Sequence, residues 1–248
     1  MTCDWKCEKE RIEQMVRRAL WESGCEGVVV GLSGGVDSAV AFTLCAGAVG
    51  KEQVKGLMLP SAVSREEDLR DAETLCRSLG IPFQVIPIQP VLDSFHALPG
   101  ITDSPYLSGN LMARIRMAIL YYFANREHRL VCGTSNRSEY MLGYCTKFGD
   151  NAADIQPILH LYKREVYEFA RSLGVPEPIL TKTPSAGLWV GQSDEGEIGL
   201  TYAEIDASLE ALEKNGWNAT TSVEERVLAL VKKSQHKRSP AVNLRGYP

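Results

Sequence analysis

The sequence predicts an α/β fold, a doubly wound parallel sheet with helices on both faces. Helix-like and strand-like segments alternate from end to end, the pattern of parallel strands joined by helices. The first strand-like run, 27–32, is apolar and β-branched without alternation, as expected of a strand buried on both faces. The 248 residues, 44% of them hydrophobic, suffice for one large core. We therefore expect a single domain over 1–248, with no amidase domain attached.

The composition argues against several classes of function. A net charge of −4 disfavours a dedicated nucleic-acid binder, which is usually basic. No apolar run is long enough to cross a bilayer, and the N-terminus lacks the apolar segment of a signal peptide. The seven scattered cysteines favour a reducing cytoplasm. Cys3 and Cys7 could be metal ligands, but no second Cys or His pair follows at a zinc-like spacing.

The first half of the chain contains the start of the sheet. Apolar residues at helical spacing over 12–20 predict a first helix, which Gly24 should end. The strand over 27–32 leads through a Gly-rich turn at 33–36 into a helix over 37–48. A second strand over 54–59, a helix opened by a capping box of Ser64 and Glu67, and a third strand over 83–88 should follow.

The second half supplies a fourth strand and more helices. A long helix over 107–126 precedes the strand at 129–133, and helices follow at 135–142 and 163–173. Two capping boxes should open the last two helices: Thr201 with Glu204, and Ser222 with Glu225. The remaining segments, 89–106 and 181–200, lack periodicity and are longer than ordinary connections, so we expect irregular binding loops or lids there.

A phosphate-binding loop is predicted where the first strand turns into its helix. Its residues are Ser33, Gly34, Gly35, Val36, Asp37 and Ser38. Glycines at such a turn let backbone N–H groups approach an anion, and the helix N-terminus favours negative charge. The string is neither a Walker A loop nor a dinucleotide fingerprint, because it has no Lys and its glycine spacing differs. A plain Gly-rich turn with a Ser or Asp cap is the alternative.

Two carboxylates are expected beside this loop. Asp37 follows the first strand and Glu139 the fourth, so both should lie at the carboxyl edge of the sheet, where open α/β folds bind ligands. Mg²⁺ prefers a few carboxylate oxygens combined with phosphate oxygens. We therefore predict that Asp37 and Glu139 hold Mg²⁺, although Glu139 taken alone could equally be a solvated helix carboxylate.

The string GLSGGVDSAV at 31–40 resembles the pyrophosphate loop of the N-type ATP pyrophosphatases. These enzymes adenylate a carbonyl or carboxylate oxygen and release pyrophosphate, and they include GMP, asparagine and NAD synthetases and tRNA-modifying enzymes. The resemblance implies an adenine nucleotide alpha hydrolase-like fold and this type of reaction. It leaves the substrate open.

Motifs in the second half resemble NAD synthetases in particular. The matching strings are GTSNRSE at 133–139, TKFGD at 146–150 with Asp154, KR at 163–164, TPSA at 183–186, GLTY at 199–202 and HKRSP at 236–240. They cover nearly the whole chain in the family's order. The resemblance implies ATP-dependent amidation of deamido-NAD with ammonia, through an acyl-adenylate, giving NAD, AMP and pyrophosphate.

The same resemblance implies roles for individual residues. ATP is bound by Gly31, Ser33, Gly34, Gly35, Asp37, Ser38, Thr134, Lys163 and Ser185. Deamido-NAD is bound by Tyr106, Arg114, Tyr144, Lys147, Asp154, His236 and Lys237. Lys163 and Asp150 take the catalytic roles, Mg²⁺ is the cofactor, and the enzyme is a homodimer. Ammonia is the expected nitrogen donor because glutamine-dependent relatives carry an additional amidase domain.

The chain also departs from the family. Asn151-Ala152 replaces a glycine pair, which should stiffen that loop. Ser185-Ala186-Gly187 stands where Thr-Ala-Asp is common, and Ser135-Asn136-Arg137 where Asp-His-Ala is usual. These changes leave the predicted reaction class intact.

Three alternatives remain open at this point. The basic string at 232–238 could be a nucleic-acid or targeting patch, or a solvated helix end, instead of a dinucleotide contact. A sulfur-transferring or tRNA-modifying enzyme would use a reactive cysteine, for which Cys132 and Cys145 are candidates. A non-catalytic adenine-nucleotide sensor could retain the same fold.

Overall fold

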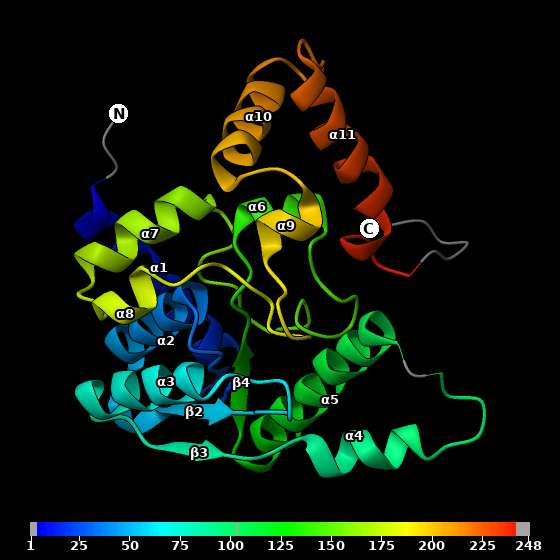
Figure 1. Ribbon diagram of the computed structural model, residues 1–248. Helices are drawn as coiled ribbons and strands as arrows, with labels where there is room; N and C mark the ends of the chain where they lie inside the picture. Colours follow the sequence, from blue (N-terminus) through cyan, green and yellow to red (C-terminus); the bar gives the residue numbers. More distant parts are fainter. Residues whose placement is uncertain (1–3, 103, 242–248) are drawn as a thin grey trace.

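The computed structural model describes residues 4–102 and 104–241 and contains a four-stranded sheet with the order β3-β2-β1-β4. The strands are β1 (Gly27–Gly31), β2 (Val54–Met58), β3 (Phe83–Val85) and β4 (Arg129–Cys132). All pairs are parallel, and Val30 lies opposite Gly56 on one side and Cys132 on the other. Because β1 is central and β2 and β4 flank it, the loops after β1 and β4 open at one edge of the sheet (Figure 1).

Helices cover both faces of this sheet, which confirms the predicted fold class. They are α1 (Trp5–Ser23), α2 (Val36–Val49), α3 (Glu66–Leu79), α4 (Gln89–His96), α5 (Pro105–Arg126), α6 (Arg137–Leu142), α7 (Lys163–Ser172), α8 (Glu177–Leu180), α9 (Asp194–Ile198), α10 (Tyr202–Lys214) and α11 (Ser222–Ser234). Val28 and Val30 of β1 pack into the core beneath α1, α2 and α7, whereas Val29 points to the opposite core beneath α4 and α5. The uninterrupted apolar run of β1 therefore serves two cores at once.

A third apolar cluster lies beyond the sheet. Ile205 and Leu209 of α10 pack against Val227 of α11, and Leu142 of α6 joins them. In Figure 1 the α10–α11 pair stands above α6 and α9, apart from the strands. The carboxyl edge of the sheet consequently lies between the main α/β body and this helical pair.

Several predicted boundaries differ from those observed. The segments predicted to be irregular each contain a short helix, α4 within 89–106 and α9 within 181–200. The predicted capping box at Ser64 is wrong. The N-cap of α3 is Arg65, one residue later, and the Ser64 hydroxyl accepts from the Ser61 N–H instead. The capping box at Ser222 is also shifted, since Thr221 is the cap of α11 and its hydroxyl accepts from the Glu224 N–H.

Other start and stop signals behave as predicted. Gly24 ends α1 in the left-handed region at φ 70°, a conformation that glycine adopts without steric cost. Thr201 caps α10, and the Glu204 carboxylate accepts from the Thr201 N–H in return. Across residues 4–102 and 104–241, the apolar length needed to span a bilayer is not reached by any helix.

Candidate active site

The Gly-rich loop between β1 and α2 is closed by its own serines. The Ser33 hydroxyl accepts from the Gly35 N–H at 3.2 Å and lies 3.1 Å from the Ser38 hydroxyl. The Ser38 hydroxyl also donates to the Gly35 carbonyl at 3.0 Å. Gly34 has φ 78°, and a Cβ there would collide with the Asp68 carbonyl of α3, so only glycine fits. The loop therefore presents backbone N–H groups and two hydroxyls at the start of α2, as an anion site requires.

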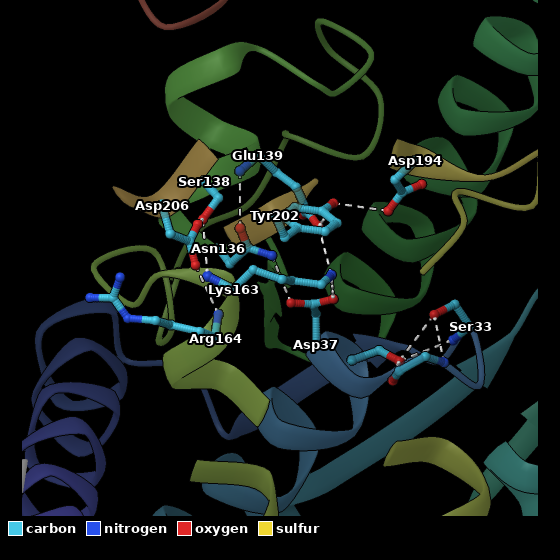
Figure 2. Close-up of polar contacts among 12 residues, drawn as sticks. Ser33, Asp37, Asn136, Ser138, Glu139, Lys163, Arg164, Asp194, Tyr202 and Asp206 are labelled. Carbon is cyan, nitrogen blue, oxygen red and sulfur yellow. Dashed lines mark hydrogen bonds and ion pairs between the residues drawn. The ribbon is translucent and has the colours of Figure 1, made fainter. Parts of the chain in front are cut away.

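Lys163 joins the two carboxylates that were predicted to hold a metal. Its ammonium donates to Asp37 Oδ2 at 2.6 Å and to Glu139 Oε1 at 2.8 Å (Figure 2). The ammonium also lies 4.9 Å from the centre of the Tyr202 ring. Only 3% of the Lys163 side chain is exposed, so the ion pairs are shielded from solvent. The three residues come from α2, α6 and α7. Asp37 and Glu139 meet at the carboxyl edge of the sheet as predicted, and Lys163 joins them from α7.

Lys163 is held by its position at the first turn of α7. Its backbone N–H donates to the Ser138 hydroxyl at 2.9 Å, and the Arg164 N–H donates to Asp206 Oδ2 at 3.0 Å. Ser138 in turn donates to the Asp206 carboxylate. These bonds satisfy N–H groups that a helix start leaves without partners. They fix α7 against α6 and α10, and so aim Lys163 at the site.

Asn136 is a site residue whose role sequence reasoning missed. It is fully buried, its amide nitrogen donates to Asp37 Oδ1 at 2.8 Å, and its amide oxygen accepts from the Glu139 N–H at 3.0 Å. One side chain thus orients Asp37 and caps the helix that carries Glu139. At this position, where the chain departs from the family pattern, the Asn136 amide therefore bonds both Asp37 and the helix that carries Glu139. Helix-cap preference for Asn was the signal that could have identified it.

Burial and charge act in opposite directions on the ionisable groups. Burial raises the pKa of Glu139 to about 7, an effect that the Lys163 ammonium opposes and Asp37 reinforces. Burial alone would lower the pKa of Lys163, but the carboxylates of Asp37 and Glu139 raise it well above its ordinary value. Lys163 is therefore a cation in the site, and its charge favours the ionised forms of Asp37 and Glu139.

A third carboxylate, Asp194, lies on the far side of Tyr202. The Tyr202 hydroxyl donates to Asp194 Oδ2 at 2.9 Å and is 3.1 Å from Glu139 Oε1 (Figure 2). Asp194 is 4% exposed, and burial raises its pKa. Tyr202 thereby connects segment 181–200 to the carboxylates of the site. Tyr202 belongs to the GLTY string that resembles the family, but the sequence assigned no role to Tyr202 or to Asp194.

The side chains assigned to deamido-NAD gather at a neighbouring position. Arg114 of α5 donates to the Lys147 carbonyl at 3.2 Å, and the Lys147 ammonium donates to the His236 carbonyl at 2.6 Å. The Lys237 ammonium donates to the carbonyls of Gly143 and Cys145, each at 2.7 Å. Residues from three distant segments thus form one basic group, which includes two of the seven residues of the string that could have been a nucleic-acid patch.

The remaining predicted residues occupy varied environments. The Tyr144 hydroxyl donates to Glu197 Oε2 at 2.8 Å, and Ser185 donates to the Gln192 carbonyl at 2.8 Å. Asp150 is exposed to solvent, and its carboxylate accepts from the Thr146 N–H at 2.8 Å. Asp154 accepts from the Val131 N–H at 2.7 Å, so one of its oxygens supports the end of β4.

Three further predicted residues lie near these groups. Tyr106, in the first turn of α5, is 62% exposed. Thr134 is half-buried directly after β4. Gly31 ends β1, and a Cβ there would lie 3.3 Å from the Leu120 side chain. The Asn151 amide nitrogen donates to the Lys237 carbonyl at 3.2 Å and its oxygen accepts from the Phe148 N–H at 2.8 Å, two contacts that a glycine side chain could not make.

The thiols at the site are poor nucleophiles. Burial raises the pKa of Cys145 to about 12. Cys132 is buried with its sulfur 3.6 Å from that of Cys45, and both this contact and burial raise its pKa. A reactive cysteine is normally a thiolate near neutral pH. The raised thiol pKa values disfavour the sulfur-transfer alternative.

The alternative metal site at Cys3 and Cys7 falls partly outside the described residues, because Cys3 is not among them. Among the described residues, no group of three or more His, Cys, Asp or Glu side chains could hold a metal ion.

Comparison with known proteins identifies relatives over nearly the full chain. The NAD synthase family model matches residues 8–241. An NH₃-dependent NAD⁺ synthetase of Methanoregula boonei is 60% identical over 98% of both chains. The structure of NMN synthetase from Francisella tularensis superimposes with a TM-score of 0.90 at 39% identity, covering 97% of this chain and 98% of that one. The structure of an NH₃-dependent NAD synthetase from Campylobacter jejuni superimposes with a TM-score of 0.84 at 35% identity, covering 98% of this chain and 100% of that one.

Proposed function

The chain belongs to the NAD synthase family, and from this premise we propose that it converts deamido-NAD to NAD with ATP and ammonia. It is a carbon–nitrogen ligase whose other products are AMP and pyrophosphate. The observation that carries the proposal is the Lys163 ammonium, bonded to Asp37 and Glu139 beside a Gly-rich anion loop. That arrangement suits a reaction in which pyrophosphate leaves, and it argues against a nucleotide sensor with no chemistry to perform.

The reaction overcomes the low reactivity of a carboxylate. The nicotinate carboxylate attacks the α-phosphorus of ATP, and the bond to the bridging oxygen of pyrophosphate breaks. Ammonia then attacks the acyl-adenylate and expels AMP. Lys163 and the loop N–H groups stabilise the charge that develops on the departing pyrophosphate. No side chain needs to form a covalent bond to the substrate, so the protein contributes positioning and electrostatics.

Magnesium fits the residues present. Asp37 and Glu139 supply hard carboxylate oxygens from two elements, and in the described chain no third acidic, His or Cys ligand completes a metal cluster with them. Mg²⁺ usually takes one or two carboxylates together with substrate phosphates. Asp37 and Glu139 would therefore hold the ion jointly with ATP. When bound, it neutralises phosphate charge and orients the triphosphate.

The dinucleotide and the remaining ATP contacts are assigned by their position. Ser33, Ser38, Thr134 and Ser185 would hold ATP, while Arg114, Lys147, His236 and Lys237 would hold deamido-NAD. The basic group of Arg114, Lys147, His236 and Lys237 supports the assignment to deamido-NAD, because the pyrophosphate that joins the two nucleotides carries two negative charges. Asp150, in the same loop as Lys147, would take the catalytic role toward the attacking ammonia; its hydrogen bond with the Thr146 N–H fixes the carboxylate and supports this assignment.

A homodimer in the cytoplasm completes the proposal. Large apolar side chains are exposed along α4, α5 and the segment between them, namely Val91, Phe95, Leu98, Ile101, Tyr106 and Leu107. Apolar patches of this kind commonly mark protein interfaces. The six described cysteines are all free thiols, as expected in a reducing compartment.

The nitrogen donor provides the direct test. Purified protein with ATP, Mg²⁺ and deamido-NAD should form NAD and AMP when ammonium is added, whereas glutamine alone should give no product. Turnover at a fixed total ammonium concentration should rise with pH, because the neutral amine is the nucleophile. Chromatographic quantification of NAD and AMP measures both. Glutamine-driven synthesis equal to that with ammonium would contradict the proposal.

A second candidate product is NMN, because the NMN synthetase structure has a TM-score of 0.90 to this chain. The same amidation would then act on the mononucleotide, which lacks the adenylate half of deamido-NAD. Comparing kcat/KM for deamido-NAD and nicotinate mononucleotide in one assay separates the two. The 60% identical relative favours NAD.

Segment 181–200 is expected to close over the bound substrates. An acyl-adenylate is hydrolysed if water reaches it, so the site should be covered after loading. Although it contains α9, the segment has left-handed glycines at Gly187 and Gly191 and an 83% exposed Val190 between them. Limited proteolysis should therefore cut near 187–191 rapidly in the free protein and slowly with ATP and deamido-NAD together. Equal cleavage rates would identify a fixed loop.

A further inference from the structure

Lys182 makes three contacts that sequence analysis did not anticipate. It follows α8, and its ammonium donates to Asp68 Oδ1 at 2.7 Å, to Asp71 Oδ2 at 2.5 Å and to the Gly34 carbonyl at 3.3 Å. The first two acceptors belong to α3, and the third lies in the phosphate loop. The side chain is 12% exposed, so these contacts are largely protected from water.

The contact with Gly34 determines the orientation of one peptide plane. In a trans peptide the carbonyl of residue 34 and the N–H of residue 35 point in opposite directions. With the Gly34 carbonyl directed to Lys182, the Gly35 N–H points into the loop, where it donates to the Ser33 hydroxyl at 3.2 Å. The Gly35 N–H therefore lies on the same side of the turn as the Ser33 and Ser38 hydroxyls.

This peptide lies between two glycines, so its orientation is held by the Lys182 and Ser33 contacts and not by side chains of its own. Neither neighbour has a Cβ, and Gly34 already adopts φ 78°. A flipped plane would present the Gly34 carbonyl oxygen to the phosphates and withdraw the Gly35 N–H. Asp71 holds the Lys182 ammonium in place, and Asp68 shares its carboxylate between Lys182 and Arg65.

Building on the function proposed above, we propose that Lys182 is a positioning residue for the phosphate loop. It keeps the Gly34 carbonyl on the α3 side and thereby directs the Gly35 N–H toward the pyrophosphate group of ATP. The residue acts through the loop, and it places the base of segment 181–200 in direct contact with the nucleotide-binding turn.

The test uses Lys182→Met with inorganic pyrophosphate and Mg²⁺ as the probe, measured by isothermal titration calorimetry. We expect pyrophosphate affinity to fall about tenfold, and the KM for ATP to rise similarly, as for loss of one hydrogen bond to a charged ligand. The KM for deamido-NAD should stay within about twofold, which a general loss of structure would not allow. Lys182→Arg, which keeps the donor, should restore most of the affinity.

Lys55→Met is the matched control. Lys55 is similarly protected at 17% exposure and pairs with Glu127, but it lies at the opposite, amino edge of the sheet. It should lose comparable stability without losing pyrophosphate affinity. If Lys182→Met is too unstable, Asp71→Asn removes one anchor of the ammonium and should give a smaller change of the same kind. Unchanged affinity in folded Lys182 variants would overturn this inference, whereas failure of the wild-type protein to bind pyrophosphate would overturn the proposed function instead.

Discussion

Replacing Asp37 or Glu139 with Ala should lower turnover by roughly 10²–10³-fold, because the pyrophosphate charge loses part of its electrostatic stabilisation. Both carboxylates contact the Lys163 ammonium, so either change also leaves that cation with a single anionic partner. Initial rates of AMP release at saturating ATP and increasing Mg²⁺ measure the effect. High Mg²⁺ should recover part of the activity, since the ion retains one protein ligand and the phosphates.

Glu127→Ala is the appropriate comparison for these variants. Glu127 pairs with Lys55, Arg126 and Arg129 near the start of β4, away from the phosphate loop. Its replacement should alter thermal stability but not the Mg²⁺ dependence of turnover. Near-normal activity of folded Asp37→Ala or Glu139→Ala at moderate Mg²⁺ would show that the assigned ligand role is wrong for that residue.

Replacing Lys163 with Met should have the largest effect of any single change. The variant loses the ammonium that bridges the two carboxylates, and turnover should fall by at least about 10³-fold. It should also be less stable by about 3–5 kcal/mol, because two buried carboxylates are left without their cation. Urea denaturation gives the stability change, and single-turnover formation of AMP gives the chemical rate.

A double variant separates these two consequences. Lys163→Met combined with Glu139→Gln leaves one buried charge instead of two, so stability should partly return while catalysis stays absent. A double-mutant cycle measures the coupling between the two positions. Recovery of catalysis together with stability would mean that Lys163 acts only on the fold, and its role toward pyrophosphate would have to be abandoned.

The sequence predicted the fold and the carboxylate pair because both depend on local, periodic signals. A β-branched run before a Gly-rich turn determines where Asp37 lies, and parallel pairing of β1 with β4 brings Glu139 to the same edge. Such placement follows from topology alone. The Thr201 cap was predicted for the same reason, since its partner is three residues away.

What the sequence did not predict depends on contacts between distant segments. Lys182 and Asp71 are 111 positions apart, and nothing in either local sequence indicates that they pair. Asn136 looked like a departure from a family motif until its amide was found on Asp37, 99 positions away. The short helices α4 and α9 were missed because eight and five residues offer too few turns for a periodic pattern.

The placement of Lys163 has a consequence for how the protein folds. Two acidic side chains that face each other with little exposure to solvent would normally oppose folding. Here the polypeptide carries its own ammonium between them, so the chain itself offsets their mutual repulsion. If the proposed magnesium site is correct, a chelator should therefore lower activity and leave the unfolding midpoint in urea nearly unchanged.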